Sequence, residues 1–364
     1  MRVVIAPDKF AGTLTAVEAA DAIATGWRRR VPDAELVTVP MSDGGPGFVD
    51  VLHAALGGDL VAVTVADPYG EPVPATILVV GETAYLESAQ AAGLHLTPES
   101  ARAPRRGSSR GVGELIAAAL EGGATRIVLG AGGSATSDGG AGLLSALGAT
   151  ADVPLDAGPD GLAGIGALDL SAARARTAGV ELVLASDVDN PLLGLFGATK
   201  TYGPQKGLTE DDLVEVDGLL TAFAGLAGRK AASEKGAGAA GGIGYALLLL
   251  GATRAPGVET VAAAVDLPGR LSGADLVVTG EGSFDFSSRS GKVPYGVAQA
   301  AAEHLLPCIA LAGQVLVGSR EMRALGIEAA YAVVDLVGEE RAFAAPSDAL
   351  ADLAERVART WGRE

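Results

Sequence analysis

The stretch Gly130-Ala131-Gly132-Gly133-Ser134-Ala135-Thr136-Ser137-Asp138-Gly139-Gly140-Ala141-Gly142 is the most informative part of this chain. It follows residues 126–129, an apolar run that predicts a short buried strand, and it leads into residues 142–147, which predict the start of a helix. Glycine permits positive φ and lets backbone N–H groups approach an anion closely. The segment is therefore typical either of a phosphate-binding loop or of a tight strand-to-helix turn whose glycines serve packing.

The same alternation of apolar runs and alanine-rich stretches continues along the chain, and it predicts βα units with a largely parallel sheet. The expected strands are Val3–Ala6, Glu35–Val39, Arg126–Leu129, Glu181–Ala185, Leu276–Thr279, Cys308–Leu311 and Ala329–Val334. Residues 61–94 predict a short antiparallel meander instead, and residues 151–175 an irregular connection.

We expect an α/β fold of two domains. The first is a Rossmann-like or flavodoxin-like, mostly parallel domain built from both chain ends, with expected boundaries 1–60, 106–150 and 270–364. The second is a smaller inserted α/β domain, expected to cover 61–105 and 151–269. We expect the active site in the cleft between them, because open α/β sheets bind ligands outside the carboxyl ends of their strands.

Composition excludes several classes of function. The 364 residues are 49% hydrophobic, enough for a large core, and the net charge of −17 argues against nucleic acid or an anionic membrane surface as a partner. One cysteine, Cys308, excludes an intrachain disulfide and four-cysteine zinc sites. The N-terminal apolar run is too short for a signal peptide, so we expect a cytoplasmic protein, monomeric or homodimeric.

Carboxylates follow several of the predicted strands within a few residues. Each alone equally suits a helix cap or a turn, but their recurrence indicates a site. Lysine is rare, and Lys9, Lys206 and Lys292 fall in loop-like motifs where an ammonium group would suit phosphate or carboxylate oxygens. A solvated surface lysine is the alternative for each.

Named motifs narrow the choice of chemistry. The chain has no G-x-x-x-x-G-K-[ST] motif, and its absence does not support a P-loop NTPase. Residues 130–135 and 236–241 match the glycine spacing of the dinucleotide-binding fingerprint. The first segment is not followed by an acidic strand end at the expected distance, and the second is not preceded by a strand. An NAD-dependent oxidoreductase acting on a small hydroxy acid stays an alternative, as does a non-catalytic small-anion binding protein. Many carboxylates and glycine-rich loops, with no histidine or thiol nucleophile, suit Mg²⁺-assisted phosphoryl transfer.

Seven motifs, in order along nearly the whole chain, resemble those of the type I glycerate kinase family. They are Ile5–Phe10, Ser42–Gly45, Gly132–Gly142, Ser186–Gly194, Tyr202–Gly207, Gly236–Gly242 and Thr279–Gly282. The resemblance implies ATP-dependent phosphorylation of D-glycerate, with 2-phosphoglycerate favoured over 3-phosphoglycerate, and a two-domain α/β fold. The chain departs from the family pattern at Ala11, where lysine is common, and at Pro46, where glutamate is usual. These departures bear on substrate contacts more than on the reaction class.

Roles for single residues follow from charge and spacing. We expect Asp187 to be the base that accepts the glycerate hydroxyl proton, and Asp189 to orient substrate or metal. Lys9 and Lys292 would neutralise phosphoryl charge. The expected metal ligands are Asp43, Glu281 and Asp285. The expected substrate- and phosphate-binding residues are Asp8, Gly132, Gly133, Ser134, Ser137, Asp138, Asn190, Lys206 and Arg110, although Arg110 lies in a basic loop that equally suits a surface charge run.

Overall fold

The computed structural model describes residues 1–10, 12–285 and 292–362. The chain divides into two compact units, which we call unit 1 (residues 1–43, 50–57 and 256–364) and unit 2 (residues 44–49 and 58–255). Both carry helices on mostly parallel sheets, so the predicted two-domain α/β class is confirmed. No helix within the described part of the chain has the length and apolarity to cross a bilayer.

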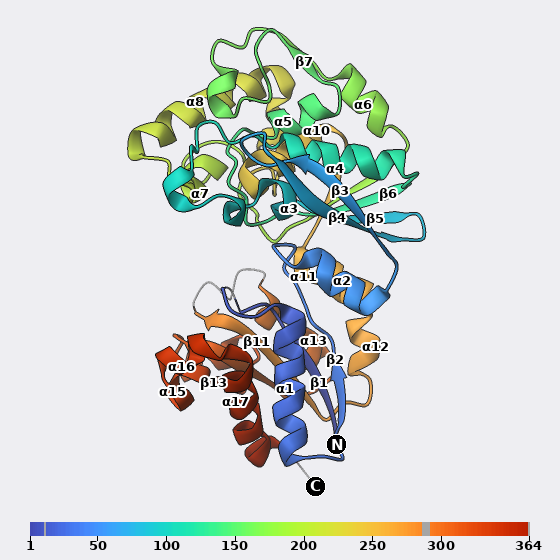
Figure 1. The fold of residues 1–364 in the computed structure, drawn as a ribbon, viewed down its shortest axis with the longest axis vertical. Coiled ribbons are helices and arrows are strands. Elements are labelled where there is room, and N and C mark those ends of the chain that lie inside the picture. Colours follow the sequence, from blue (N-terminus) through green and yellow to red (C-terminus); the bar gives the residue numbers. More distant parts are fainter. Residues whose placement is uncertain (11, 286–291, 363–364) are drawn as a thin grey trace. The chain divides into compact units, whose positions relative to one another are not determined.

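Unit 1 is built on one parallel sheet (Figure 1). Its elements are β1 (Arg2–Pro7), α1 (Ala16–Arg30), β2 (Glu35–Thr38), most of α2 (Phe48–Leu56), α11 (Gly257–Ala264), α12 (Leu267–Leu271), β11 (Leu276–Phe284), α13 (Val293–Glu303), β12 (Cys308–Val315), α14 (Ser319–Ala324), β13 (Ala329–Ala332), α15 (Val333–Val337), α16 (Glu339–Ala344) and α17 (Pro346–Trp361). The strand order is β13-β12-β11-β1-β2, and every neighbouring pair is parallel.

Local sequence signals explain the helices that cover one face of this sheet. Thr15 caps α1, and its side chain and that of Glu18 form a reciprocal capping box. Pro346 occupies the first turn of α17, where its missing N–H costs nothing. The two helices pack side by side (Figure 1). Gly26 makes this close approach possible, because a Cβ at that position would collide with the backbone of Ala351.

The chain reverses its direction across the sheet of unit 1 between β1 and β11. It runs from β1 outward to β2, and then returns to the other side of β1 to form β11, β12 and β13 in turn. The carboxyl ends of β1 and β11 therefore form a topological switch point, the usual ligand site of an open α/β sheet. The backbone N–H of Asp8, directly after β1, donates to the carbonyl of Gly280 in β11 at 2.8 Å.

Unit 2 holds a six-stranded mixed sheet. Its elements are β3 (Asp59–Ala66), β4 (Pro72–Val80), β5 (Thr83–Glu87), α3 (Ala89–Ala92), η1 (Leu94–Leu96), η2 (Glu99–Ala101), α4 (Arg110–Glu121), β6 (Arg126–Gly130), α5 (Ala141–Ala146), β7 (Thr150–Ala151), η3 (Pro159–Leu162), β8 (Leu168–Asp169), α6 (Ser171–Thr177), β9 (Glu181–Ala185), α7 (Ala198–Lys206), α8 (Glu210–Ala227), α9 (Arg229–Ala232), η4 (Ala239–Gly242), α10 (Ile243–Leu249) and β10 (Thr253–Ala255). The order is β10-β9-β6-β5-β4-β3. The strands β3, β4 and β5 form the predicted antiparallel meander, and β5, β6, β9 and β10 are parallel.

The structure corrects the predicted boundaries. Residues 106–150 lie in unit 2 rather than with the chain ends, because β6 pairs with β5 on one side and β9 on the other. Residues 256–269 lie in unit 1, and the inserted unit is the larger of the two, not the smaller. Residues 151–175 are less irregular than expected, since they contain β8 and parts of β7 and α6.

Two strand ends also differ from the sequence prediction. The strand β11 continues through residues expected to form a loop, as far as Phe284, because its pairing with β12 extends to Phe284 opposite Val315. The last strand is shorter than expected and ends at Ala332, where β12 ceases to pair with it and the helix α15 begins.

Candidate active site

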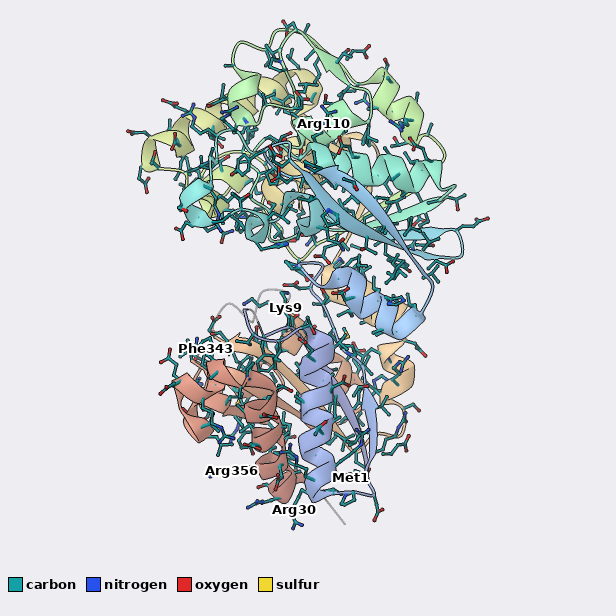
Figure 2. All side chains as sticks on the ribbon, viewed as in Figure 1. Met1, Lys9, Arg30, Arg110, Phe343 and Arg356 are labelled. Atoms are coloured by element: carbon teal, nitrogen blue, oxygen red, sulfur yellow. The ribbon has the colours of Figure 1, made fainter. Side chains whose placement is uncertain are left out.

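A cavity of about 550 Å³ lies in unit 1 at the switch point of the sheet. We call it the switch-point cavity. Figure 2 shows Lys9 and Phe343, which both line it, at the same end of unit 1. Six of its charged lining residues were predicted from the sequence as site residues: Asp8, Lys9, Asp43, Glu281, Asp285 and Lys292. The fold thus brings together residues that are up to 284 positions apart in the sequence.

Lys9 lies between two carboxylates in the loop after β1. Its Nζ is 3.5 Å from a carboxylate oxygen of Asp8 and 3.5 Å from one of Asp43. Burial raises the pKa of Asp8 to about 6, although the Lys9 ammonium opposes the shift. Burial alone would lower the pKa of Lys9, but the two carboxylates outweigh it and raise that pKa. Lys9 therefore stays charged, while Asp8 holds its proton more readily than an ordinary carboxylic acid.

Glu281 and Lys292 form a second ion pair in the cavity. Glu281 is a residue of β11, only 6% exposed, and its carboxylate lies 3.9 Å from Nζ of Lys292, which caps α13. Asp285 follows the end of β11, and its carboxylate accepts a hydrogen bond from the Ser283 hydroxyl at 3.4 Å. Both lysines of this cavity thus lie at loop ends, where an ammonium can reach a bound anion.

The donor set of the switch-point cavity suits a hard cation. Five carboxylates and two ammonium groups line it, so a polyphosphate would be repelled unless a divalent cation accompanied it. Mg²⁺ prefers oxygen ligands and commonly uses one or two carboxylates together with phosphate oxygens. Among the described residues, which include the predicted ligands Asp43, Glu281 and Asp285, no three His, Cys, Asp or Glu side chains are arranged to hold a metal by themselves. The residues fit a cation shared with a phosphate.

The glycine-rich loop, residues 130–142 of unit 2, is held by the buried carboxylate of Asp138. This carboxylate accepts hydrogen bonds from the backbone and hydroxyl of Ser109, both at 2.8 Å, and from the amides of Gly140 and Gly142 at 3.0 and 3.1 Å. Burial nevertheless raises its pKa, since these bonds only partly offset desolvation. Asp138 therefore shapes the turn into α5.

Lys206 holds the middle of the same loop. Its ammonium, on a residue only 3% exposed, donates to the Ser134 hydroxyl at 3.1 Å and to the Thr136 carbonyl at 2.5 Å. Burial lowers the pKa of Lys206 to about 7, against the pull of Asp138. Gly241 packs against this point, because a Cβ there would collide with the Thr136 carbonyl and lie 2.8 Å from the Lys206 nitrogen.

Several amides of the glycine-rich loop already have protein partners. The Gly132 amide donates to the Ser88 hydroxyl at 3.3 Å, and the Gly139 amide donates to the Gly241 carbonyl at 3.1 Å. Gly133 has a φ of +65° and lies against Pro46, whose ring would be 2.9 Å from an added Cβ. Packing thus explains many of these glycines. Phosphate contact by Gly132, Gly133, Ser134 or Ser137 stays a prediction.

The loop after β9 brings Asp187, Asp189 and Asn190 into one segment of unit 2. Asp189 is 56% exposed at its side chain and pairs with Lys235 at 2.9 Å and Arg254 at 2.7 Å. The hydrogen bond from Lys235, with help from Arg254, lowers its pKa. 

Both polar atoms of the Asn190 side-chain amide form hydrogen bonds. Its nitrogen donates to the Phe196 carbonyl at 2.7 Å, and its oxygen accepts from the Tyr202 hydroxyl at 2.8 Å. These bonds fix the loop backbone beside Asp187, which is half-buried.

Arg110 lies at the start of α4 (Figure 2) and forms surface ion pairs with Glu114 at 2.9 Å and Asp156 at 2.6 Å. These pairs are what a surface charge run predicts, and substrate contact by Arg110 stays a prediction. Of the two departures from the family pattern, Pro46 packs on the glycine-rich loop as described, whereas Ala11 lies outside the described residues.

Sequence reasoning missed the apolar side of the switch-point cavity. Val333, Val334, Ala342, Phe343 and Leu350 line it, and they come from α15, α16 and the start of α17. One signal was available, because Phe343 follows the charged run 339–341 on a short helix and so was a candidate for an exposed aromatic side chain.

Comparisons with known proteins point to one family. The model of the glycerate kinase family matches residues 3–362. The chain is 43% identical over 345 residues to a glycerate kinase of Bacillus subtilis (strain 168), and the alignment covers 92% of this chain and 90% of the relative. It is 40% identical over 372 residues to the glycerate 2-kinase of Escherichia coli (strain K12), covering 99% and 98%.

A solved structure is similar along the whole chain. It is a crystal structure of a protein assigned as glycerate kinase 2 from Salmonella typhimurium LT2, with a TM-score of 0.83, 38% sequence identity and coverage of 99% of this chain and 98% of that one.

Proposed function

Because the chain belongs to the glycerate kinase family, we propose that it transfers the γ-phosphoryl group of ATP to the 2-hydroxyl of D-glycerate, giving 2-phosphoglycerate and ADP. The observation that carries this proposal is the switch-point cavity, where two lysines and four carboxylates converge at the carboxyl ends of β1 and β11. Phosphoryl transfer depends mainly on positioning and electrostatic stabilisation, and this cavity offers both.

Lys9 and Lys292 would offset the negative charge of the phosphates in this mechanism. Each ammonium is already oriented by carboxylates, at 3.5 Å for Lys9 and 3.9 Å for Lys292, so little reorganisation accompanies the approach of an anion. Asp43, Glu281 and Asp285 would hold Mg²⁺, one or two of them at a time. The bound ion would supply positive charge that offsets the charge of the phosphate oxygens.

Asp187 is the proposed proton acceptor. The glycerate hydroxyl oxygen forms a bond to the γ-phosphorus, the bond from that phosphorus to the ADP oxygen breaks, and the hydroxyl proton passes to the Asp187 carboxylate. Asp189 would orient the loop through its ion pairs with Lys235 and Arg254. Asn190 would keep the backbone of this loop in place through its bonds to Phe196 and Tyr202.

The test is a coupled assay of ADP release with the purified full chain. We expect ADP only when ATP, Mg²⁺ and D-glycerate are all present, and we expect product NMR to place the phosphate on the 2-hydroxyl. Addition of EDTA should stop the reaction, and excess Mg²⁺ should restore it. No ADP with D-glycerate, together with reduction of NAD by a small hydroxy acid, would establish the oxidoreductase alternative instead.

A further inference from the structure

The apolar side of the switch-point cavity has no role in the chemistry described so far. Glycerate is a small, wholly polar acid, and phosphate and Mg²⁺ are polar too, so none of them benefits from an apolar wall. Yet this side of the cavity is lined by Val333 and Leu350, which are only 4% and 1% exposed, and by Phe343, which is 64% exposed. We call Val333, Val334, Ala342, Phe343 and Leu350 the apolar wall.

Three helices hold the apolar wall in place, two short ones and the longer α17. The helices α15, α16 and α17 pack on one another, and α17 also packs on β12 and α1. Phe343 therefore projects from a helix that is anchored to the core of unit 1. An aromatic ring that is held this way and left largely exposed over buried aliphatic side chains offers one face to a flat, apolar ligand.

The geometry of the sheet relates the wall to the charged end of the cavity. Val333 directly follows β13, while Glu281 and Lys9 belong to β11 and to the loop after β1. In the order β13-β12-β11-β1, one strand separates β13 from β11 and two separate it from β1. Neighbouring strands lie about 4.8 Å apart, so these ends are roughly 10 and 15 Å from the end of β13. An extended nucleoside triphosphate covers such a span.

From these contacts we infer that the apolar wall is the nucleobase subsite of the switch-point cavity, with Phe343 stacking on the purine ring while Lys9 and Lys292 meet the phosphates. The inference rests on the proposed function, since it assigns the place of its nucleotide. It makes unit 1 the nucleotide-binding unit. The carboxylate of Glu339, which also lines the cavity, is an acceptor for the amino or hydroxyl donors of the nucleoside.

The experiment separates the base from the phosphates. Binding of Mg²⁺ with a non-hydrolysable ATP analogue, and of Mg²⁺ with inorganic tripolyphosphate, is measured by calorimetry on the full chain. The variants are Phe343→Ala, Phe343→Trp and Lys292→Met. Val214→Ala is the matched control, because Val214 is 63% exposed on α8 in unit 2 and lines no part of the cavity.

Loss of stacking should weaken binding of the ATP analogue to Phe343→Ala by about 5- to 150-fold. Tripolyphosphate binding by this variant should not change, because that ligand has no base. Phe343→Trp should keep the affinity of the unchanged chain for the analogue, and Val214→Ala should match it for both ligands. Lys292→Met should weaken both ligands, since it removes a phosphate contact.

Two results would overturn the nucleobase subsite. One is equal affinity of Phe343→Ala and the unchanged chain for the ATP analogue. The other is an equal loss for the analogue and for tripolyphosphate at an unchanged melting temperature. Failure of the proposed function looks different, because the analogue would then bind in a Phe343-dependent way while D-glycerate and ATP gave no ADP.

Discussion

The polar side chains at the switch point of unit 1 line a cavity, whereas those of the glycine-rich loop in unit 2 are buried, and the side chains of Ser134 and Asp138 there hydrogen-bond to other groups of the protein. Lys9 and Lys292 pair with carboxylates at 3.5 to 3.9 Å on the wall of a 550 Å³ cavity. Lys206, in contrast, is 3% exposed and donates to a hydroxyl and a carbonyl of the loop that it supports. A lysine in a loop-like motif can therefore line a cavity or support a loop, and the exposure of its side chain distinguishes the two cases.

Topology explains why the cavity lies where it does. In unit 1 the strand order reverses between β1 and β11, so the loops after these strands diverge and leave space at the sheet edge. In unit 2 the parallel strands β5, β6, β9 and β10 follow one another across the sheet in chain order, with no reversal. The loop after β6 is instead packed by segment 236–242 and by α7.

The largest expected effect tests whether unit 2 contributes a chemical group at all. Asp187→Asn keeps the shape of the side chain but removes the proton acceptor, so kcat should fall on the order of 10²–10⁴-fold with the KM for D-glycerate nearly unchanged. Steady-state kinetics over a range of Mg²⁺ concentrations measures this.

Asp189→Asn is the comparison for the Asp187 variant, because Asp189 orients the loop through exposed ion pairs but accepts no proton, so this variant should lower kcat far less than Asp187→Asn. A raised Mg²⁺ requirement in Asp187→Asn would make this residue a metal ligand instead. An unchanged kcat would restrict the chemistry to the charged groups of unit 1.

The second prediction concerns the buried carboxylate of the glycine-rich loop. Asp138→Ala leaves the amides of Gly140 and Gly142 and the groups of Ser109 without their acceptor, and it should lower the free energy of unfolding by about 3 kcal/mol. Asp189→Ala removes only exposed pairs and should cost less than about 1 kcal/mol. Urea denaturation monitored by circular dichroism compares the two. Equal costs would mean that burial does not distinguish these carboxylates.

The third prediction concerns a change in how stability depends on pH. Burial lowers the pKa of Lys206 to about 7 in the folded chain, against its ordinary value of 10.5. Between these values the unfolded chain binds more protons, so Lys206 makes stability rise with pH, by at most about 1.4 kcal/mol per pH unit. The free-energy cost of burying the charged Lys206 ammonium is fully present below pH 7. Lys206→Met should remove this part of the slope.

Unfolding measured from pH 6 to 10 tests the Lys206 prediction. Lys230→Met is the matched control, since Lys230 is an exposed lysine of α9 and its loss should leave the slope as it is. Parallel curves for Lys206→Met and the unchanged chain would show that Lys206 does not titrate in this range.

Much of the local structure could be predicted because it depends on neighbours in the sequence. Alternating apolar runs predicted all seven named strands, since a strand buried on both faces is a short continuous apolar segment. Glycine at 130–142 predicted a turn into a helix, because its positive φ values are local requirements. Family membership also followed from ordered motifs alone.

Contacts between distant segments decided the rest. Nothing near residues 106–150 in the sequence says that β6 pairs with β5 and β9, so the unit boundary became visible only in the sheet. The sequence predicted loop-like motifs around both Lys206 and Lys292, but folding buries one ammonium under a loop and leaves the other on a cavity wall. Phe343 became part of that cavity only when α16 packed on α15 and α17. The sequence by itself determined which chemical groups this protein has; the tertiary structure decided which of them line a cavity and which are buried, because exposure depends on what packs on each group from elsewhere in the chain.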